Sequence, residues 1–368
     1  MQRVLSLLII LLISAPINLL GEDISVGCMF GLTGDSAAFG KGELDAVTLA
    51  TEEWNAKGGI NGKKITLEVE DTATTQAKIV SAYKKLTEVS GHKFIMGPTW
   101  LETYQAIIPL AEKKHVLLIT PSAEGHAIKH ADPKSPWALS TYYSSEEEIS
   151  RLLGALKQQG AKKIVGLYTE EPFFLLVRQM VEEQAKRLGL EVVYSDNQAF
   201  GFTGFRNLLP KIKQLQPDAI LAMQSAEGSV LDLLQARAEQ MPNVTIVGIH
   251  DFAGFVNKAE FKRYLDKIIF SKFVLADPSF AIRFKQRFGY EPILTHSNAY
   301  DTANMVFTAL ANGKDDGASM REFLLNSELK TVTFGAVRFT PSGMINTSKV
   351  QIQKISAGTE SVLSAVAQ

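Results

Sequence analysis

The chain has 368 residues, of which 46% are hydrophobic, and its formal net charge is −1. The length is enough for two domains, and the balanced charge argues against nucleic acid and anionic membranes as partners. A single cysteine, Cys28, excludes an internal disulfide, so the core alone must stabilise the fold.

The first 21 residues are typical of an export signal. Met1-Gln2-Arg3 is a basic start, Val4–Leu20 is apolar, and Gly21-Glu22-Asp23 ends the apolar stretch abruptly. Polar residues and a proline interrupt that stretch, which favours a signal peptide cleaved near Gly21 over a membrane anchor. We therefore expect a periplasmic or extracellular protein whose mature part does not insert into membranes. Cys28 is either a lipid-attachment site or, as we favour, a small hydrophobic residue that points into a sheet.

Strands alternate with helices from residue 24 onward. The pattern predicts strand 24–30, helix 40–57, strand 64–70, helix 74–90, strand 94–99, helix 100–114 and strand 116–121. After Trp137 it predicts a helix that begins near Ser145, strands 164–168, 192–194, 219–223 and 245–249, and helices 174–188, 204–215 and 228–239. The last part contains strand 267–270, a helix with Phe280, Phe284 and Phe288, helix 296–312, and short β elements at 332–334, 337–340 and 349–355.

Apolar runs such as 219–223 are typical of parallel strands that are covered on both faces. The predicted strands are too many for one sheet. We therefore expect an α/β fold with two doubly wound lobes and a small-molecule cleft between them.

Sequence motifs for catalysis and metal binding are absent. The chain has no Gly-x-Ser-x-Gly, no His-Glu-x-x-His and no phosphate-binding loop, and its first glycines lack the dinucleotide-binding spacing. His126 and His130 are four residues apart, but they lie in a predicted loop, so we expect solvated histidines rather than a zinc site. The sequence therefore predicts no enzyme activity, no cofactor and no metal. The acid run Glu146–Glu148 is expected to stabilise the start of a helix.

Aromatic residues gather where predicted strands lead into helices. Because the loops after parallel strands meet at one edge of a sheet, we expect these rings to form an apolar wall of the cleft rather than parts of the core. They are Phe39, Trp100, Tyr142, Tyr143, Phe173, Phe174 and Phe252.

Several motifs resemble those of type I periplasmic solute-binding proteins, in the leucine/isoleucine/valine-binding branch that serves ATP-driven importers. They are Gly31-Leu32-Thr33-Gly34, Asn55-Ala56-Lys57-Gly58-Gly59-Ile60-Asn61-Gly62-Lys63, Asp71, Gly97-Pro98 and Ile119-Thr120-Pro121-Ser122-Ala123. The resemblance covers essentially the whole mature chain. It implies two lobes joined by three hinge strands, which close around a ligand. Lobe 1 would comprise residues 22–140 and 275–343, and lobe 2 residues 141–274 and 344–360, with crossings near 140–142, 273–276 and 343–346.

The resemblance also implies ligand-binding positions, which this chain keeps in part. Phe39 and Phe173 keep the aromatic character of two pocket walls. The positions that hold an amino acid's carboxylate read Trp100-Leu101-Glu102-Thr103 and Ser122-Ala123-Glu124, and the acid that pairs with its amino group falls at His250 or, as we favour, Asp251. The ligand-binding candidates are Phe39, Trp100, Glu102, Thr103, Ser122, Ala123, Glu124, Tyr142, Phe173, Ser225, His250 and Asp251.

Glu102 and Glu124 depart from the family pattern. If both face the cleft, their charge favours a cationic or amide ligand over a plain amino acid. Alternatively, Glu102 caps the helix with Thr99 and Glu124 points to solvent.

The sequence therefore predicts an exported, monomeric solute-binding protein that delivers an amino acid or a related amide or amine to the permease of an ABC importer. The alternatives are a sensor that presents its closed form to a signalling receptor and an exported hydrolase. The hydrolase would need a nucleophile and a base that the sequence does not display.

Overall fold

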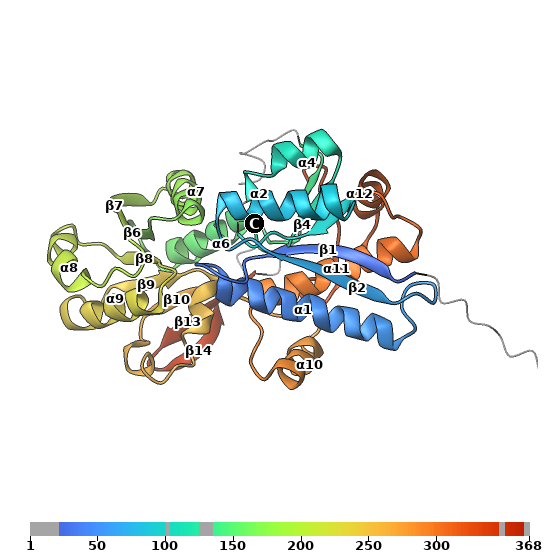
Figure 1. The fold of residues 1–368 in the computed structure, drawn as a ribbon. Helices are drawn as coiled ribbons and strands as arrows, with labels where there is room; N and C mark the ends of the chain where they lie inside the picture. Colours follow the sequence, from blue (N-terminus) through green and yellow to red (C-terminus); the bar gives the residue numbers. More distant parts are fainter. Residues whose placement is uncertain (1–21, 101–103, 125–134, 346–349, 364–368) are drawn as a thin grey trace, which may run out of the picture.

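The computed structural model describes residues 22–100, 104–124, 135–345 and 350–363. In this part of the chain the strands form a five-stranded sheet, a seven-stranded sheet and a two-stranded hairpin. Figure 1 shows the two large sheets side by side, each with its own helices, so the protein has two lobes.

Lobe 1 contains the five-stranded sheet, whose order is β2-β1-β3-β4-β5 with all strands parallel. Because the order reverses between β1 and β3, the topological switch point lies there. The strands are β1 (Ile24–Phe30), β2 (Ile65–Asp71), β3 (Phe94–Met96), β4 (Leu117–Thr120) and β5 (Ala138–Ser140). The lobe also contains α1 (Ala37–Ala56), α2 (Gln76–Lys84), α4 (Ile108–Lys114), α10 (Ser279–Phe288), α11 (Leu294–Ala311), α12 (Gly317–Asn326), β11 (Leu329–Thr331) and β12 (Gly335–Val337).

Lobe 2 repeats this topology. Its sheet has the order β7-β6-β8-β9-β10, continued by the antiparallel strands β13 and β14, so a second switch point lies between β6 and β8. The strands are β6 (Lys163–Thr169), β7 (Glu191–Gln198), β8 (Ala219–Met223), β9 (Thr245–Gly248), β10 (Ile268–Phe273), β13 (Val350–Ser356) and β14 (Thr359–Leu363). The helices are α6 (Ser145–Gln158), α7 (Pro172–Leu188), α8 (Phe205–Gln214) and α9 (Glu227–Gln240). The prediction of two doubly wound α/β lobes is confirmed.

Three connections join the lobes, between β5 and α6, between β10 and α10, and between β12 and β13. Ser140 forms a parallel bridge with Met344, so the first and third connections run beside each other. Phe273, at the end of β10, packs edge-on against Phe334 of lobe 1 with ring centroids 5.8 Å apart.

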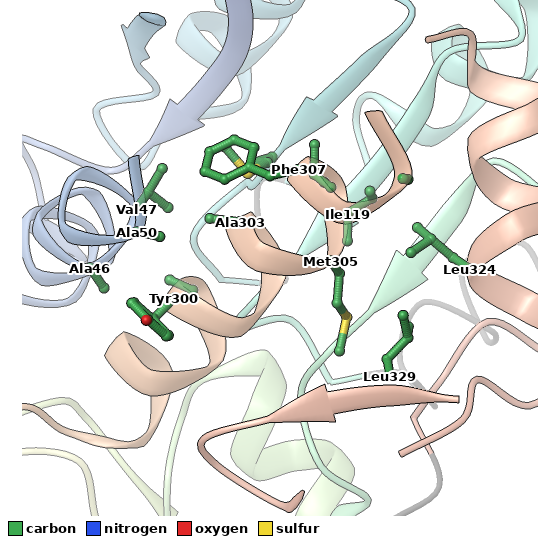
Figure 2. Packing of buried hydrophobic residues seen from close by; sticks show 14 of the residues in the cluster. Ala46, Val47, Ala50, Ile119, Tyr300, Ala303, Met305, Phe307, Leu324 and Leu329 are labelled. Carbon is green, nitrogen blue, oxygen red and sulfur yellow. The ribbon is translucent and has the colours of Figure 1, made fainter. Parts of the chain in front are cut away.

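The core of lobe 1 depends on the close packing of α1 on α11 (Figure 2). Ala46, Val47 and Ala50 of α1 are buried in one cluster with Ala303 and Phe307 of α11. Small side chains let two helices approach closely, since they leave room for the neighbouring backbone. Cys28 is a buried free thiol in β1, as we favoured from the sequence. None of the described helices is both long and apolar enough to span a membrane.

Some predicted elements have different bounds. The predicted helix 74–90 is α2 followed by a π-helical turn at Lys85–Val89. A continuous helix over 100–114 is wrong, because residues 105–107 form a turn and α4 begins at Ile108. The proline at 109 has no N–H to donate and fits the first turn of a helix, which sets this start.

The short β element predicted at 332–334 is wrong, since β11 and β12 flank a turn there, whereas the one predicted at 337–340 overlaps the end of β12 at Val337 and an antiparallel bridge of Phe339 with Ile345. The buried carboxylate of Asp301 accepts hydrogen bonds from the N–H groups of Val332 at 2.7 Å and Thr333 at 3.0 Å. These N–H groups are therefore not available to a neighbouring strand.

Candidate functional site

The loops at the two switch points carry predicted site residues. In lobe 1, Phe39 lies in the first turn of α1 after β1 and Trp100 follows β3, with ring centroids 5.2 Å apart. In lobe 2, Glu171 follows β6 and Ser225 follows β8, and the Ser225 Oγ donates a hydrogen bond to the Glu171 Oε2 at 2.7 Å. Each switch point is thus bridged by a contact between its two loops.

The two switch points face each other. Partial burial raises the pKa of Glu171, and so do the negative charges of Asp251 and Asp35. The hydrogen bond from Ser225 lowers this pKa, but by less. Asp35 belongs to lobe 1, so Glu171 lies within electrostatic reach of the opposite lobe. Phe173, in the first turn of α7, packs against buried clusters of both lobes.

Hydrogen bonds hold the loops of lobe 1 in place. The Asp71 Oδ1 accepts from the N–H groups of Leu32 at 2.9 Å, Thr33 at 3.2 Å and Ala73 at 2.8 Å, which fixes the loop after β1. The Trp100 N–H donates to the Ser122 Oγ at 3.2 Å, which joins the loops after β3 and β4.

The first residues of the loop after β4 are held by hydrogen bonds to Thr120 and Ser140. The N–H groups of Ser122 and Ala123 donate to the Thr120 Oγ1 at 3.3 Å and 3.0 Å, and the Ala123 carbonyl accepts from the Ser140 Oγ at 2.7 Å. Ser122, Ala123 and Glu124 are all buried. The interpretation that Glu124 points to solvent is therefore wrong. Its charge acts on the nearby Tyr142 hydroxyl.

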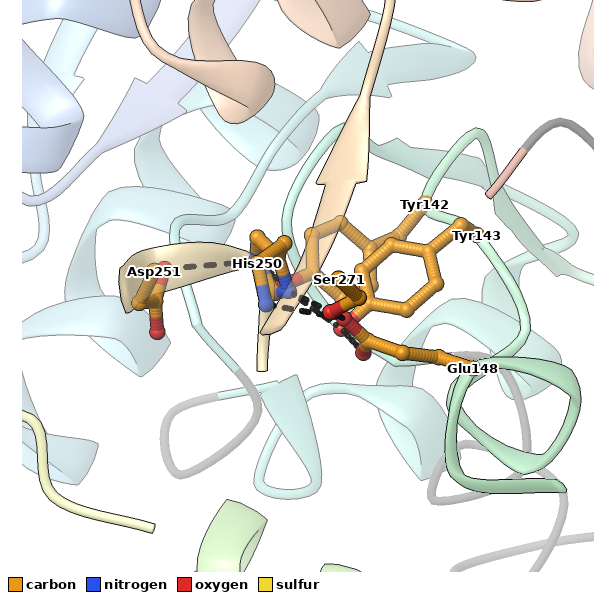
Figure 3. Close-up of polar contacts among 6 residues, drawn as sticks. All are labelled: Tyr142, Tyr143, Glu148, His250, Asp251 and Ser271. Carbon is orange, nitrogen blue, oxygen red and sulfur yellow. Dashed lines mark hydrogen bonds and ion pairs between the residues drawn. The ribbon is translucent and has the colours of Figure 1, made fainter. Parts of the chain in front are cut away.

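A polar group that is buried except for Asp251, here called the His250 cluster, lies where lobe 2 meets the first connection. Figure 3 shows its six members, Tyr142, Tyr143, Glu148, His250, Asp251 and Ser271. The Glu148 carboxylate of α6 accepts from the Tyr143 hydroxyl at 2.7 Å, from the His250 N–H at 2.9 Å and from the Ser271 Oγ. The His250 Nδ1 lies 3.1 Å from the Glu148 Oε1, and the Nε2 lies 3.2 Å from the Asp251 Oδ1 and 3.3 Å from the Tyr142 hydroxyl.

The electrostatics of the cluster favour an ionised pair. Burial by itself would lower the pKa of His250, but the charges of Asp251 and Glu148 raise it to about 9. Burial opposes ionisation of Glu148. Its pKa is nevertheless held below the usual range by the charge and hydrogen bonds of His250 and by the hydroxyls of Ser271 and Tyr143. Burial, together with the nearby carboxylates, raises the pKa of both tyrosines well above the ordinary value.

The cluster separates the two candidates for the amine-binding acid. The His250 side chain is 8% exposed and is directed into the cluster, whereas the Asp251 side chain is 40% exposed. Asp251 is therefore the member of the pair that a ligand can reach.

Other predictions have different outcomes. Phe174 and Phe252 are buried in the two hydrophobic clusters of lobe 2, and Tyr143 is buried in the core cluster of lobe 1, so the assignment of these three rings to a cleft wall is wrong. Phe174 follows Phe173 by one helical position, which turns it by about 100° toward the core.

Glu102, Thr103, His126 and His130 lie outside the described residues. In the part of the chain that the structure describes, no three His, Cys, Asp or Glu residues form a group that could hold a metal.

The roles of Glu43, Glu148 and Glu171 were not predicted from the sequence. Glu171 lies two residues after the end of β6, in a strand-to-helix loop as other candidates do, so its position was a usable signal. The acid run of Glu148 does lie in the first turn of α6, as predicted, but Glu148 itself is buried and paired. Its partner His250 is 102 positions away along the chain, and no local pattern could join them.

Comparison with known proteins gives the same fold and a family. The profile of the family described as Periplasmic binding protein matches residues 23–360. The Leu/Ile/Val-binding protein homolog 8 of Brucella abortus is 23% identical over 319 residues, which cover 79% of this chain and 77% of that protein. The Leu/Ile/Val-binding protein BraC3 of Rhizobium johnstonii is 36% identical over 104 residues, and this match spans 27% of each chain.

Solved structures share the fold. LivJ from Streptococcus pneumoniae, in complex with isoleucine, has a TM-score of 0.78 at 23% identity and covers 93% of this chain and 99% of its own. A solute-binding protein from Rhodopseudomonas palustris, in complex with 3,4-dihydroxybenzoic acid, has a TM-score of 0.79 at 20% identity and covers 94% of this chain and 98% of its own. The chain therefore belongs to the type I periplasmic binding proteins, the solute-binding family that includes the Leu/Ile/Val-binding proteins.

Proposed function

We propose that this protein is an exported solute-binding protein that captures an amino acid, or a related amide or amine, between its lobes and delivers it to an ABC importer. The observation that carries the proposal is that the switch points of both sheets face each other. In open α/β sheets, ligands bind outside the carboxyl ends of the strands at such points. The relatives named for leucine, isoleucine and valine binding, and the neighbour bound to isoleucine, support the same class of ligand.

The side chains at these points suit a ligand with an amino group and an apolar body. Asp251 and Glu171 of lobe 2 offer carboxylate oxygens to an ammonium or amide N–H group, which forms strong charge-assisted hydrogen bonds. Phe39 and Trp100 of lobe 1 offer aromatic surface to the rest of the ligand. Ser225 orients the Glu171 carboxylate through its hydrogen bond.

The proposed mechanism is closure of lobe 1, residues 22–140 and 275–343, on lobe 2, residues 141–274 and 344–360. The three connections act as hinges, and the ligand favours the closed form because only that form gives it contacts with both lobes. The importer then recognises the closed, monomeric protein. No observation favours a sensor over a transport component.

A thermal-shift screen of amino acids, amides, amines and carboxylates tests the proposal. A ligand that binds the folded state raises the melting temperature, by an amount that grows with its concentration above the Kd. We expect amine-bearing compounds to give the largest shift. Asp251→Asn should remove that shift and the calorimetric binding, while Asp315→Asn, an exposed aspartate in lobe 1, should keep both. A complete panel without any shift, or unchanged affinity in Asp251→Asn, would refute the assignment.

A further inference from the structure

Glu43 is a buried carboxyl group directly behind the proposed ligand site. It lies on α1 one turn after Phe39, so both side chains are on the same face of the helix. The Glu43 Oε2 accepts a hydrogen bond from the Thr99 Oγ1 at 2.6 Å, and the Thr99 Oγ1 accepts from the Gly31 N–H at 3.1 Å. Glu43 itself is completely buried.

A second connection leads from Glu43 to the loop after β4. The Ser122 hydroxyl acts on the Glu43 carboxyl group, and the Ser122 Oγ accepts the hydrogen bond from the Trp100 N–H. Within the described residues, the Glu43 Oε1 is buried without a hydrogen-bond partner. Through Thr99, Gly31 and Ser122, the Glu43 carboxyl group is thus linked to three loops, those after β3, β1 and β4.

The packing of the helix alone does not account for this residue. Burying a carboxyl group costs free energy, and an apolar side chain of similar size fills a core position more favourably. What an apolar side chain cannot do is accept the Thr99 hydrogen bond, which in turn orients the Gly31 N–H.

We propose that Glu43 is a positioning residue of the ligand site, which holds the loops after β1, β3 and β4 together and changes the hydrogen bonding of the Trp100 loop when it gains or loses its proton. Its importance for ligand binding rests on the proposed function, but its effect on the loops does not.

The proton has a defined place. Burial raises the pKa of Glu43 to about 7, although the hydrogen bonds of Thr99 and Ser122 lower it. The ionised and the neutral carboxyl group are therefore both present near neutral pH. Because the Oε2 accepts from Thr99, the proton of the neutral form sits on the Oε1. The neutral Oε1–H is a donor where the ionised Oε1 is only an acceptor, so protonation reverses the hydrogen bonding that Glu43 offers toward the Ser122 hydroxyl. The ionised group instead attracts the Ser122 O–H toward itself.

Other titratable and charged groups lie around α1. His296 of α11 contacts α1 at Gly42, and burial lowers its pKa to about 4. Burial opposes ionisation of Asp71 after β2, but hydrogen bonds hold its pKa below the usual range. Further charged groups are Asp35 after β1, Glu124 after β4, and the ion pair of Glu53 with Arg283 of α10. Burial raises the pKa of the Cys28 thiol in β1 far above neutral.

Tryptophan emission tests the proposal, followed from about pH 5.5 to about pH 8.5 in the unliganded full-length chain with Trp137→Phe, which removes the indole stacked on His115. We expect a transition with its midpoint near the pKa of Glu43, about 7. It should be absent in Glu43→Gln and in Trp100→Phe, which assigns the signal to Trp100. Asp301→Asn is the matched control, because Asp301 is an equally buried carboxyl group with a pKa of about 7 in another part of lobe 1. It should keep the transition.

A second variant keeps the test decisive if Glu43→Gln does not fold. Thr99→Val removes the donor that lowers the pKa of Glu43, so the transition should move to higher pH. A transition that persists unchanged in Glu43→Gln or Thr99→Val, or its absence from the parent protein, would overturn the proposal. For the best ligand of the thermal-shift screen, the Kd should depend on pH in the parent protein and not in Glu43→Gln. A screen without hits would count against the proposed function and leave the emission result standing.

Discussion

Replacement of Glu148 by glutamine measures how much the His250 cluster stabilises the protein. Glu148 accepts hydrogen bonds from Tyr143, His250 and Ser271, and its charge faces the His250 imidazolium. Removing one partner of a buried pair costs about 3–5 kcal/mol, because the other charge stays buried without compensation. Glutamine keeps the shape and one acceptor oxygen, so we expect a loss of about 3 kcal/mol.

The pH dependence identifies the cause. The pKa of His250 is about 9 in the folded protein against 6.5 for a free histidine. Because the pKa of His250 is higher in the folded than in the unfolded state, its protonation stabilises the folded protein by about 3 kcal/mol below about pH 6.5. This stabilisation is lost as the pH rises through about 9. In Glu148→Gln the pKa of His250 falls. The variant's loss in free energy of unfolding, relative to the parent protein, should therefore be smaller at about pH 9.5 than at about pH 6, which are about the two ends of this titration.

Urea unfolding at these two pH values, followed by circular dichroism, gives the free energies of unfolding. Glu147→Gln is the matched control, because Glu147 lies in the same helical turn and pairs with Arg151 at the surface. A surface pair contributes little, so its loss should be within about 0.5 kcal/mol. Equal losses in both variants, or a deficit of Glu148→Gln that is independent of pH, would refute the reasoning.

Three further predictions concern the ligand and the core. Phe39→Ala should weaken ligand binding by about 1–2 kcal/mol through lost apolar burial, and an unchanged calorimetric affinity would exclude this ring from the site. Gly42→Ala should destabilise lobe 1 by about 1–3 kcal/mol in urea unfolding, because the added Cβ meets the His296 Nε2 at 2.1 Å and overpacks the core. Arg237→Lys should cost about 1–3 kcal/mol, since one ammonium cannot replace a buried guanidinium that donates to three backbone carbonyls. A melting temperature equal to that of the parent protein would contradict either of these last two predictions.

Apolar runs were sufficient to place the central strands. The predicted bounds 24–30 and 219–223 equal those of β1 and β8, because a parallel strand that is covered on both faces must be apolar along its length. β14 was missed for the converse reason. It has mostly exposed residues and, among the described residues, pairs with β13 alone, so burial leaves little pattern in its sequence.

For the candidate site, too, some features could be predicted from the sequence and others could not. Loop positions after strands, aromatic character and family motifs indicate Phe39, Trp100 and Asp251 from the sequence alone. The order of the strands could not be derived from periodicity, and without that order the two switch points, and the loops that meet there, stay unknown.

Local patterns therefore indicate the two lobes, their central strands and the loops of the candidate site, because each depends on side chains close together in the sequence. The partners of Glu148 and Glu43 depend on contacts between distant segments. Glu148 meets His250 across 102 positions and Glu43 meets Thr99 across 56, and a single charged residue on a helix looks the same in the sequence whether it faces water or another buried group.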